Sequence, residues 1–159
     1  NQIHNLSSII EILDPHPERI YAEYGTFRTK VEVEDFISFV MRLKGGAIVS
    51  LDGSSAVPGR GSFGDHIYGT KGQIDLGRPV KVTVTEPWGD LKVGEVNELL
   101  PPEDFPDARA TAAEGFAQAV LEGREVPIPG SYGRRALEIV RGAYLSMKRG
   151  RPVPFPVQE

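Results

Sequence analysis

The sequence predicts a single α+β domain over residues 1–159, built on a largely antiparallel, open β-sheet with helices packed on one face. Stretches rich in β-branched and aromatic residues follow one another between turn signals from residue 19 to residue 86. Segments in which apolar residues recur at helical spacing flank this region, one before it and two after it. A chain of this length can bury a hydrophobic core of its own.

The first segment reads as an amphipathic helix. Its apolar stripe consists of Ile3, Leu6, Ile10 and Leu13. The complementary polar stripe consists of His4, Ser7, Ser8 and Glu11. We expect the helix to end before Asp14-Pro15, because proline disfavours helical geometry in the residue ahead of it.

The β-rich region contains six expected strands. They span residues 19–28, 35–43, 47–56, 66–68, 73–76 and 80–86. Lys44-Gly45-Gly46 predicts a tight hairpin between the second and third of these, since glycine supplies the positive φ that such turns demand. The segment 36–43 is apolar on both faces, so we expect one face to meet helices and the other to meet a second layer or another subunit.

Two helices are expected near the end of the chain. The first has Asp107 as a possible cap, Gly123 as a stop and an apolar stripe of Ala112, Phe116, Ala119 and Val120. The second has a stripe expected to lie in the core, formed by Ala136, Ile139, Val140, Ala143, Tyr144 and Met147. The proline-rich segment 150–156 is expected to run extended across the surface.

Composition argues against several classes of protein. The net charge is −4 and the basic residues are scattered, which disfavours nucleic acid as a partner. No apolar run approaches the roughly 20 residues that span a membrane, so no membrane partner is expected. A cytoplasmic location is expected, since the lack of cysteine is compatible with it. The absence of cysteine excludes disulfides and thiolate sites, and three histidines without ligand spacing give no support for a metal site.

The segment Gly59-Arg60-Gly61-Ser62-Phe63-Gly64 has the glycine spacing of a dinucleotide-binding turn. Such a turn works when its last glycine opens a helix that faces the pyrophosphate. Here the following residues, 65–68, read as a strand. We therefore interpret the segment as a loop between two strands.

Five segments together resemble one known family in their order and spacing. They are Asn1-Gln2-Ile3-His4-Asn5-Leu6, Val33-Glu34-Asp35, Lys44-Gly45-Gly46-Ala47, Ile67-Tyr68-Gly69-Thr70-Lys71-Gly72-Gln73-Ile74, and the stretch from Arg135 to Val153. The chain resembles the C-terminal domain of the glucose-fructose oxidoreductase/inositol dehydrogenase/MocA family.

This resemblance implies a two-domain NAD(P)-dependent oxidoreductase acting on a carbinol of a sugar, polyol or related small molecule. An N-terminal Rossmann domain, absent from this sequence, would hold most of the NAD or NADP. The open sheet would mediate homo-oligomer formation. The 159 residues alone are therefore expected to be inactive.

The resemblance also implies roles for individual residues. His4 matches the family histidine that faces the nicotinamide and assists proton removal from the substrate hydroxyl, and an imidazole suits that task near neutral pH. Asn1 stands on the turn before it, near the position of a family aspartate, and Ser8 shares its helix face. His66 follows the glycine-rich loop, a place where binding groups are often presented. Asn1, Ser8 and His66 are our candidates for substrate binding.

The residues alone leave alternatives open. Without the resemblance, His4 is a solvated residue of a polar helix face. The same fold can serve as a non-catalytic ligand-binding or oligomerisation module, or as a free-standing sugar-binding domain. Trp88, which precedes Gly89-Asp90 in an expected turn, either packs over a sheet edge or stacks on a sugar.

Overall fold

The computed structural model describes residues 2–13, 16–56, 64–77, 79–100 and 108–158. The chain forms two compact units, Asn1–Gly59 with Ile128–Glu159 and, second, Arg60–Pro127. Each unit contains a four-stranded sheet in which neighbouring strands pair antiparallel. The predicted α+β class is confirmed, with the strands divided between two sheets.

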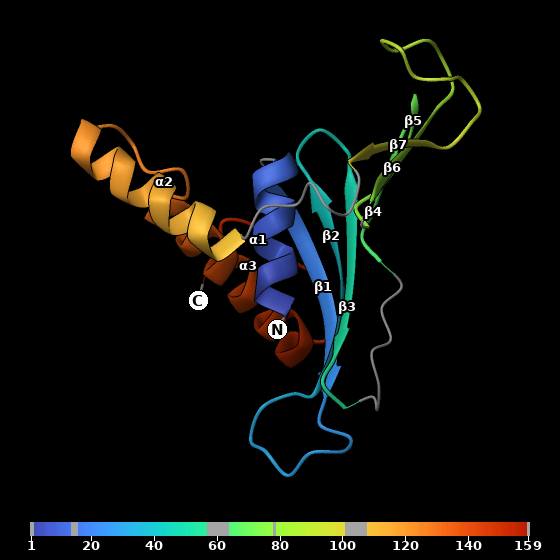
Figure 1. Ribbon diagram of the computed structural model, residues 1–159. Coiled ribbons are helices and arrows are strands. Elements are labelled where there is room, and N and C mark those ends of the chain that lie inside the picture. The colour runs from blue at the N-terminus through green and yellow to red at the C-terminus, as the bar shows by residue number, and fades with distance from the viewer. Residues whose placement is uncertain (1, 14–15, 57–63, 78, 101–107, 159) are drawn as a thin grey trace. The chain divides into compact units, whose positions relative to one another are not determined.

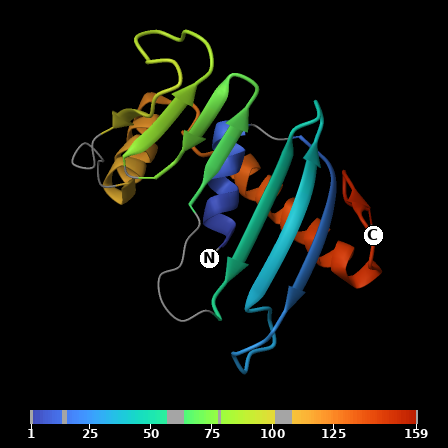
Figure 2. The same cartoon turned by 90° about the vertical axis from the view of Figure 1, so that its right-hand side faces the viewer.

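The first unit packs helices on one face of its sheet (Figure 1). Its strands follow the order β3-β2-β1-β8. Its elements are α1 (Gln2–Leu13), β1 (Pro17–Gly25), β2 (Phe36–Leu43), β3 (Ile48–Ser54), α3 (Gly130–Arg149) and β8 (Val153–Pro154). Figure 2 shows the opposite face of this sheet with no helix over it.

The core of the first unit lies between this sheet and its helices. Rows of residues that pair across strands, such as Ala22, Phe39 and Leu51, point to the helix side and are buried. Ile139 of α3 is completely buried against them. Burial of alternate residues follows from the period of two in a strand. The expected two-faced character of β2 is confirmed, because Phe36 and Val40 are exposed on the other side.

The hairpin expected between β2 and β3 is present. Gly45 and Gly46 both adopt φ of 96°, a conformation that favours glycine. The amide of Leu43 donates to the carbonyl of Ala47 at 2.9 Å and closes the turn. The two strands pair in register from Phe36 with Ser54 to Arg42 with Ile48.

The C-terminal segment contributes more to the core than the sequence indicates. Gly150 ends α3 in the left-handed conformation, with φ of 61°. The tail then returns as β8, in which Val153 pairs with Ile20 of β1 and is 1 % exposed. The expectation of an extended segment at the surface holds for most of its residues, whereas Val153 is buried and completes the core.

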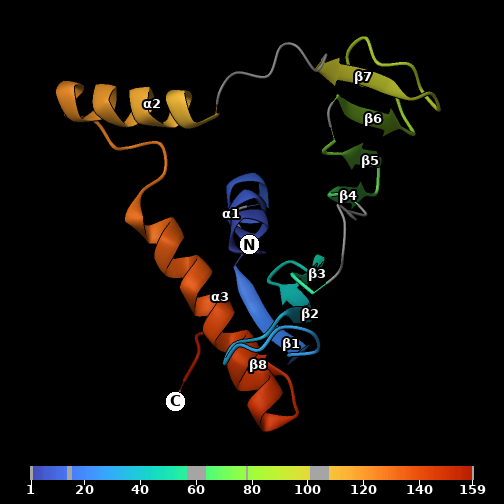
Figure 3. The same cartoon turned by 60° about the horizontal axis from the view of Figure 1, so that its bottom comes forward.

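The second unit contains β4 (His66–Gly69), β5 (Gly72–Asp75), β6 (Val80–Val84), β7 (Asn97–Leu100) and α2 (Ala108–Glu122). Figure 3 shows the four strands in the order β4-β5-β6-β7. Ile67, Ile74 and Val82 pair across three strands and share one face. Helix α2 ends where predicted, at Gly123 with φ of 65°, whereas Asp107 lies outside the described residues.

The sequence did not predict β7. Asn97-Glu98-Leu99-Leu100 is short and lacks the alternation of polar and apolar residues that marks a strand. Its pairing with β6, through Asn97 opposite Val82, is a tertiary contact that local sequence does not encode. Within the described ranges, no helix is long and apolar enough to cross a membrane.

Candidate functional site

Helix α1 carries His4 and Ser8 on its exposed side. Leu6 and Ile10 anchor the other side of the helix in the core, where they are 2 % and 1 % exposed. The helical period therefore turns the polar stripe away from the sheet. The Ser8 hydroxyl donates a hydrogen bond to the main-chain carbonyl of His4 at 3.3 Å. This contact lies within the helix and involves its backbone.

The remaining candidate residues lie elsewhere. Asn1 is outside the described residues. His66 belongs to the second unit, where it begins β4 and is exposed. Its ring lies over that of Tyr68, with centroids 6.1 Å apart. The structure thus places His4 and Ser8 one helical turn apart and assigns His66 to a different unit.

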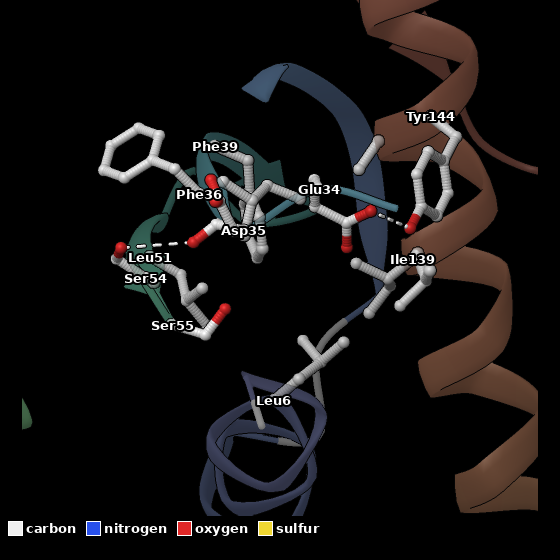
Figure 4. A pocket seen from close by; sticks show the side chains of 14 residues that line it. Leu6, Glu34, Asp35, Phe36, Phe39, Leu51, Ser54, Ser55, Ile139 and Tyr144 are labelled. Atoms are coloured by element: carbon white, nitrogen blue, oxygen red, sulfur yellow. Dashed lines mark hydrogen bonds between the residues drawn. The ribbon is translucent and has the colours of Figure 1, made fainter. Parts of the chain in front are cut away.

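A cavity that was not predicted from the sequence lies between α1, α3 and the strands β2 and β3 of the first unit (Figure 4). It has a volume of about 250 Å³. Its apolar wall includes Leu6, Phe39 and Ile139, and its polar groups include Glu34 and Ser54. Apolar surface combined with a few polar groups is typical of small-molecule sites.

One edge of this cavity is formed by a tyrosine–carboxylate pair. The Tyr144 hydroxyl donates to Glu34 Oε2 at 2.6 Å, and Tyr24 meets the Tyr144 ring edge-on with centroids 5.1 Å apart. The hydrogen bond to Glu34, followed by partial burial, raises the pKa of Tyr144 to about 12. The prediction that Tyr144 lies in the core was wrong, since it is 36 % exposed. Residues 110 positions apart form this pair, so no local pattern reveals it.

Asp35, beside Glu34, has a structural role. Its carboxylate accepts hydrogen bonds from the main-chain amides of Phe27, Arg28 and Thr29, each at 2.8 Å, and from the Thr29 hydroxyl at 3.0 Å. The Thr29 amide and then the Phe27 amide lower the pKa of Asp35 far below its ordinary value. A carboxylate so strongly held in its ionised form fixes the 26–29 turn and is a poor proton acceptor.

The described residues do not form a nucleotide-binding turn from the glycine-rich segment. Residues 59–63 lie outside them, and Gly64 and Asp65 lead into a strand, β4, rather than a helix. A pyrophosphate site of the expected kind needs a helix amino terminus at that point. In the described part of the chain, no group of three or more histidine or acidic residues is placed to hold a metal ion.

Comparison with solved structures gives matches over nearly the whole chain. An aldose-aldose oxidoreductase from Caulobacter crescentus, solved with glycerol, is 21% identical with a TM-score of 0.76 over 96% of this chain and 45% of its own. A levoglucosan dehydrogenase in complex with NADH and levoglucosan is 19% identical with a TM-score of 0.80. The match covers 97% of this chain and 48% of the dehydrogenase. The WlbA dehydrogenase from Bordetella pertussis, solved with NADH and UDP-GlcNAcA, is 18% identical with a TM-score of 0.70. The match covers 99% of this chain and 44% of WlbA.

At these identities the likeness shows a shared fold. The chain spans less than half the length of each of these structures. No curated protein matches the sequence. Residues 2–75, from α1 through β5, match the family described as the GFO/IDH/MocA C-terminal domain. The resemblance drawn from the sequence is therefore confirmed for residues 2–75, which match the C-terminal domain of this oxidoreductase family.

Proposed function

We propose that this chain is the substrate-side domain of an NAD(P)-dependent oxidoreductase that acts on a carbinol of a sugar, polyol or related small molecule. The family match covers α1, and the similar folds include dehydrogenases solved with NADH and with sugar ligands. The observation that carries the proposal is the exposed position of His4, on the helix side that faces away from the core.

In this proposal His4 performs the proton transfer. The nicotinamide, when bound, accepts a hydride from the carbinol carbon. The His4 imidazole takes the hydroxyl proton, so that the alcohol becomes a carbonyl by losing one hydride and one proton. Helix α1 holds the imidazole at a fixed place because Leu6 and Ile10 pack in the core. Asn1, Ser8 and His66 remain proposed substrate contacts.

The cofactor, NAD or NADP, is proposed to bind mainly to an N-terminal Rossmann domain, which is the partner of this chain in the complete enzyme. The 159 residues alone are accordingly expected not to turn over substrate.

The uncovered face of the first sheet supports a second proposed role, in homo-oligomer formation. Tyr21, Val40 and Ile48 lie on this face and are 39 %, 50 % and 60 % exposed. Tyr21 and Val40 are direct cross-strand partners, so their side chains form a continuous apolar surface. Apolar patches of this kind mark interaction sites. A purely oligomeric or ligand-binding module of the same fold is the alternative to the catalytic role.

Substitution of His4 in the complete protein tests the catalytic role. His4→Ala is expected to lower kcat by about 10²- to 10⁴-fold, the usual contribution of a positioned acid–base group. The matched control is His16→Ala, because His16 is also exposed but precedes β1 and lies off the helix. It is expected to keep wild-type kcat. A His4→Ala protein that folds normally by circular dichroism and retains full kcat would remove His4 from the mechanism.

A further inference from the structure

The second sheet contains a hollow beside the only tryptophan of the sequence. We call it the tryptophan hollow; its main walls are Ile67, Gly69, Lys71, Gly72, Glu86 and Trp88. Gly69 and Gly72 are cross-strand partners, and Gly72 also pairs with Val84. No side chain rises from the sheet at the two glycines, so the surface is low there. The hollow has a volume of about 560 Å³, large enough for one small molecule.

Trp88 forms a wall of this hollow and is itself 66 % exposed. The loop that carries it is fixed by hydrogen bonds. The Leu91 amide donates to the Trp88 carbonyl at 3.2 Å, and the Gly94 amide donates to the Val84 carbonyl at 2.9 Å. The Lys92 amide donates to Asn97 Oδ1 at 2.9 Å, and Asn97 Nδ2 donates to the Lys92 carbonyl at 3.1 Å. A prearranged aromatic face loses little entropy when a ligand stacks on it.

Opposite charges line the hollow next to the tryptophan. Lys71 Nζ lies 2.5 Å from Glu86 Oε1, and both side chains remain more than half exposed. The Thr85 amide donates to the Lys71 carbonyl at 2.9 Å, which holds the two residues side by side. The ammonium donates hydrogen bonds and the carboxylate accepts them, so the pair can bind neighbouring hydroxyl groups. Because the charges cancel, the pair favours a neutral ligand.

An apolar floor, an aromatic wall and a donor–acceptor pair match one kind of molecule in particular. A pyranose presents an apolar face of C–H groups and a rim of hydroxyls. We propose that the tryptophan hollow binds a pyranose sugar, with the ring stacked on Trp88 and its hydroxyls hydrogen-bonded to Lys71 and Glu86. This proposal does not depend on the proposed chemistry at His4, because the walls of the hollow all belong to the second unit and sugar binding needs no cofactor.

Fluorescence titration of the 159-residue chain tests this proposal directly. Trp88 is the sole tryptophan, so its emission reports on the hollow without interference from another indole. The probe is methyl β-D-glucopyranoside, whose equatorial substituents leave both ring faces apolar. We expect a saturable change in emission. Sorbitol, which has hydroxyls but no ring, and choline, which is a cation, are expected to give none.

Substitutions test whether the glucoside binds in the tryptophan hollow. Lys71→Met and Glu86→Gln are each expected to weaken binding of the glucoside by about tenfold, the loss of a hydrogen bond to a charged group. Lys81→Met is the matched control. Lys81 is exposed, lies opposite Asp75 in the register of β5 and β6, and points to the other face of the sheet. It is expected to bind as the wild type does.

Three results would overturn the proposal: no saturable response to the glucoside, an equal response to sorbitol or choline, or unchanged affinity in both the Lys71→Met and Glu86→Gln proteins. The His4→Ala chain is expected to give the wild-type titration. The titration can therefore disprove sugar binding in the hollow without bearing on the proposed catalytic role of His4.

Discussion

The two units of this chain are stabilised by different interactions. The first has one cluster of 13 buried apolar residues shared by its helices and sheet. Among the described residues of the second, the buried apolar side chains are those of Val82, Val84 and Ala119. Its sheet and loops depend more on close backbone approach and on hydrogen bonds such as those of Asn97. Burial holds the first unit together, whereas the second leaves much of its apolar and aromatic surface available for contact.

The largest effect on stability is expected from the core of the first unit. Ile139 is completely buried between α3 and the sheet, so Ile139→Ala removes apolar burial and leaves a cavity. We expect the free energy of unfolding to fall by about 3 kcal/mol, measured by urea denaturation followed by circular dichroism. Leu137→Ala is the matched control on the same helix; Leu137 is 63 % exposed, and its loss is expected to change stability by less than about 0.5 kcal/mol. Equal losses in both variants would contradict this account of the core.

A smaller effect is expected from the glycines of the second unit. A Cβ on Gly72 would lie 2.3 Å from the Thr83 carbonyl oxygen, whereas a Cβ on Gly69 would meet its nearest atom at an ordinary 3.5 Å. Gly72→Ala must therefore push β5 and β6 apart, at a cost of about 1–3 kcal/mol. Gly69→Ala is expected to be tolerated. Urea unfolding followed by Trp88 emission measures both, and a stable Gly72→Ala protein would show that the strands are not closely packed at this point.

The smallest effect concerns the dependence of stability on pH. The pKa of Asp35 is lower in the folded chain than the ordinary value of about 3.9, because amides of the 27–29 segment hydrogen-bond its carboxylate. Its contribution is present above the unfolded pKa and is lost as pH falls through the folded pKa. Asp35→Asn is expected to lower stability at neutral pH and to flatten its decline below about pH 4.

Thermal unfolding between neutral and acidic pH measures this dependence. Asp52→Asn is the matched control, because Asp52 lies exposed on β3 of the same sheet. It is expected to keep the acid sensitivity of the wild type. If Asp35→Asn unfolds with the same acid profile as the wild type, the hydrogen bonds to Asp35 contribute nothing to stability.

Much of the fold could be predicted from the sequence because its signals are local. The helical spacing of Leu6 and Ile10, the proline after α1, and Gly45-Gly46 between two apolar runs each act within a few residues. The order of elements and the antiparallel pairing of β2 with β3 follow from them. The short strands β7 and β8 were not predicted, because their pairing partners lie far away or their own patterns are weak.

The candidate site was predicted less completely. His4 was proposed because it lies in a segment that resembles the family, and Ser8 because it lies on the same face of the amphipathic helix. The pair of Glu34 and Tyr144 was not, since the hydrogen bond joins residues that are distant in the chain. Trp88 was placed correctly in the segment before a turn, but its exposure and its neighbours Lys71 and Glu86 became known only from the structure.

The sequence by itself determined the secondary structure of the longer elements, the family that residues 2–75 match and the residue proposed to transfer the proton, because periodicity and motifs depend on neighbouring positions. The tertiary structure decided the division into two sheets, the burial of Val153 and the placement of Trp88, Lys71 and Glu86 around one hollow. These features depend on which distant segments pack together, and packing is a property of the whole chain.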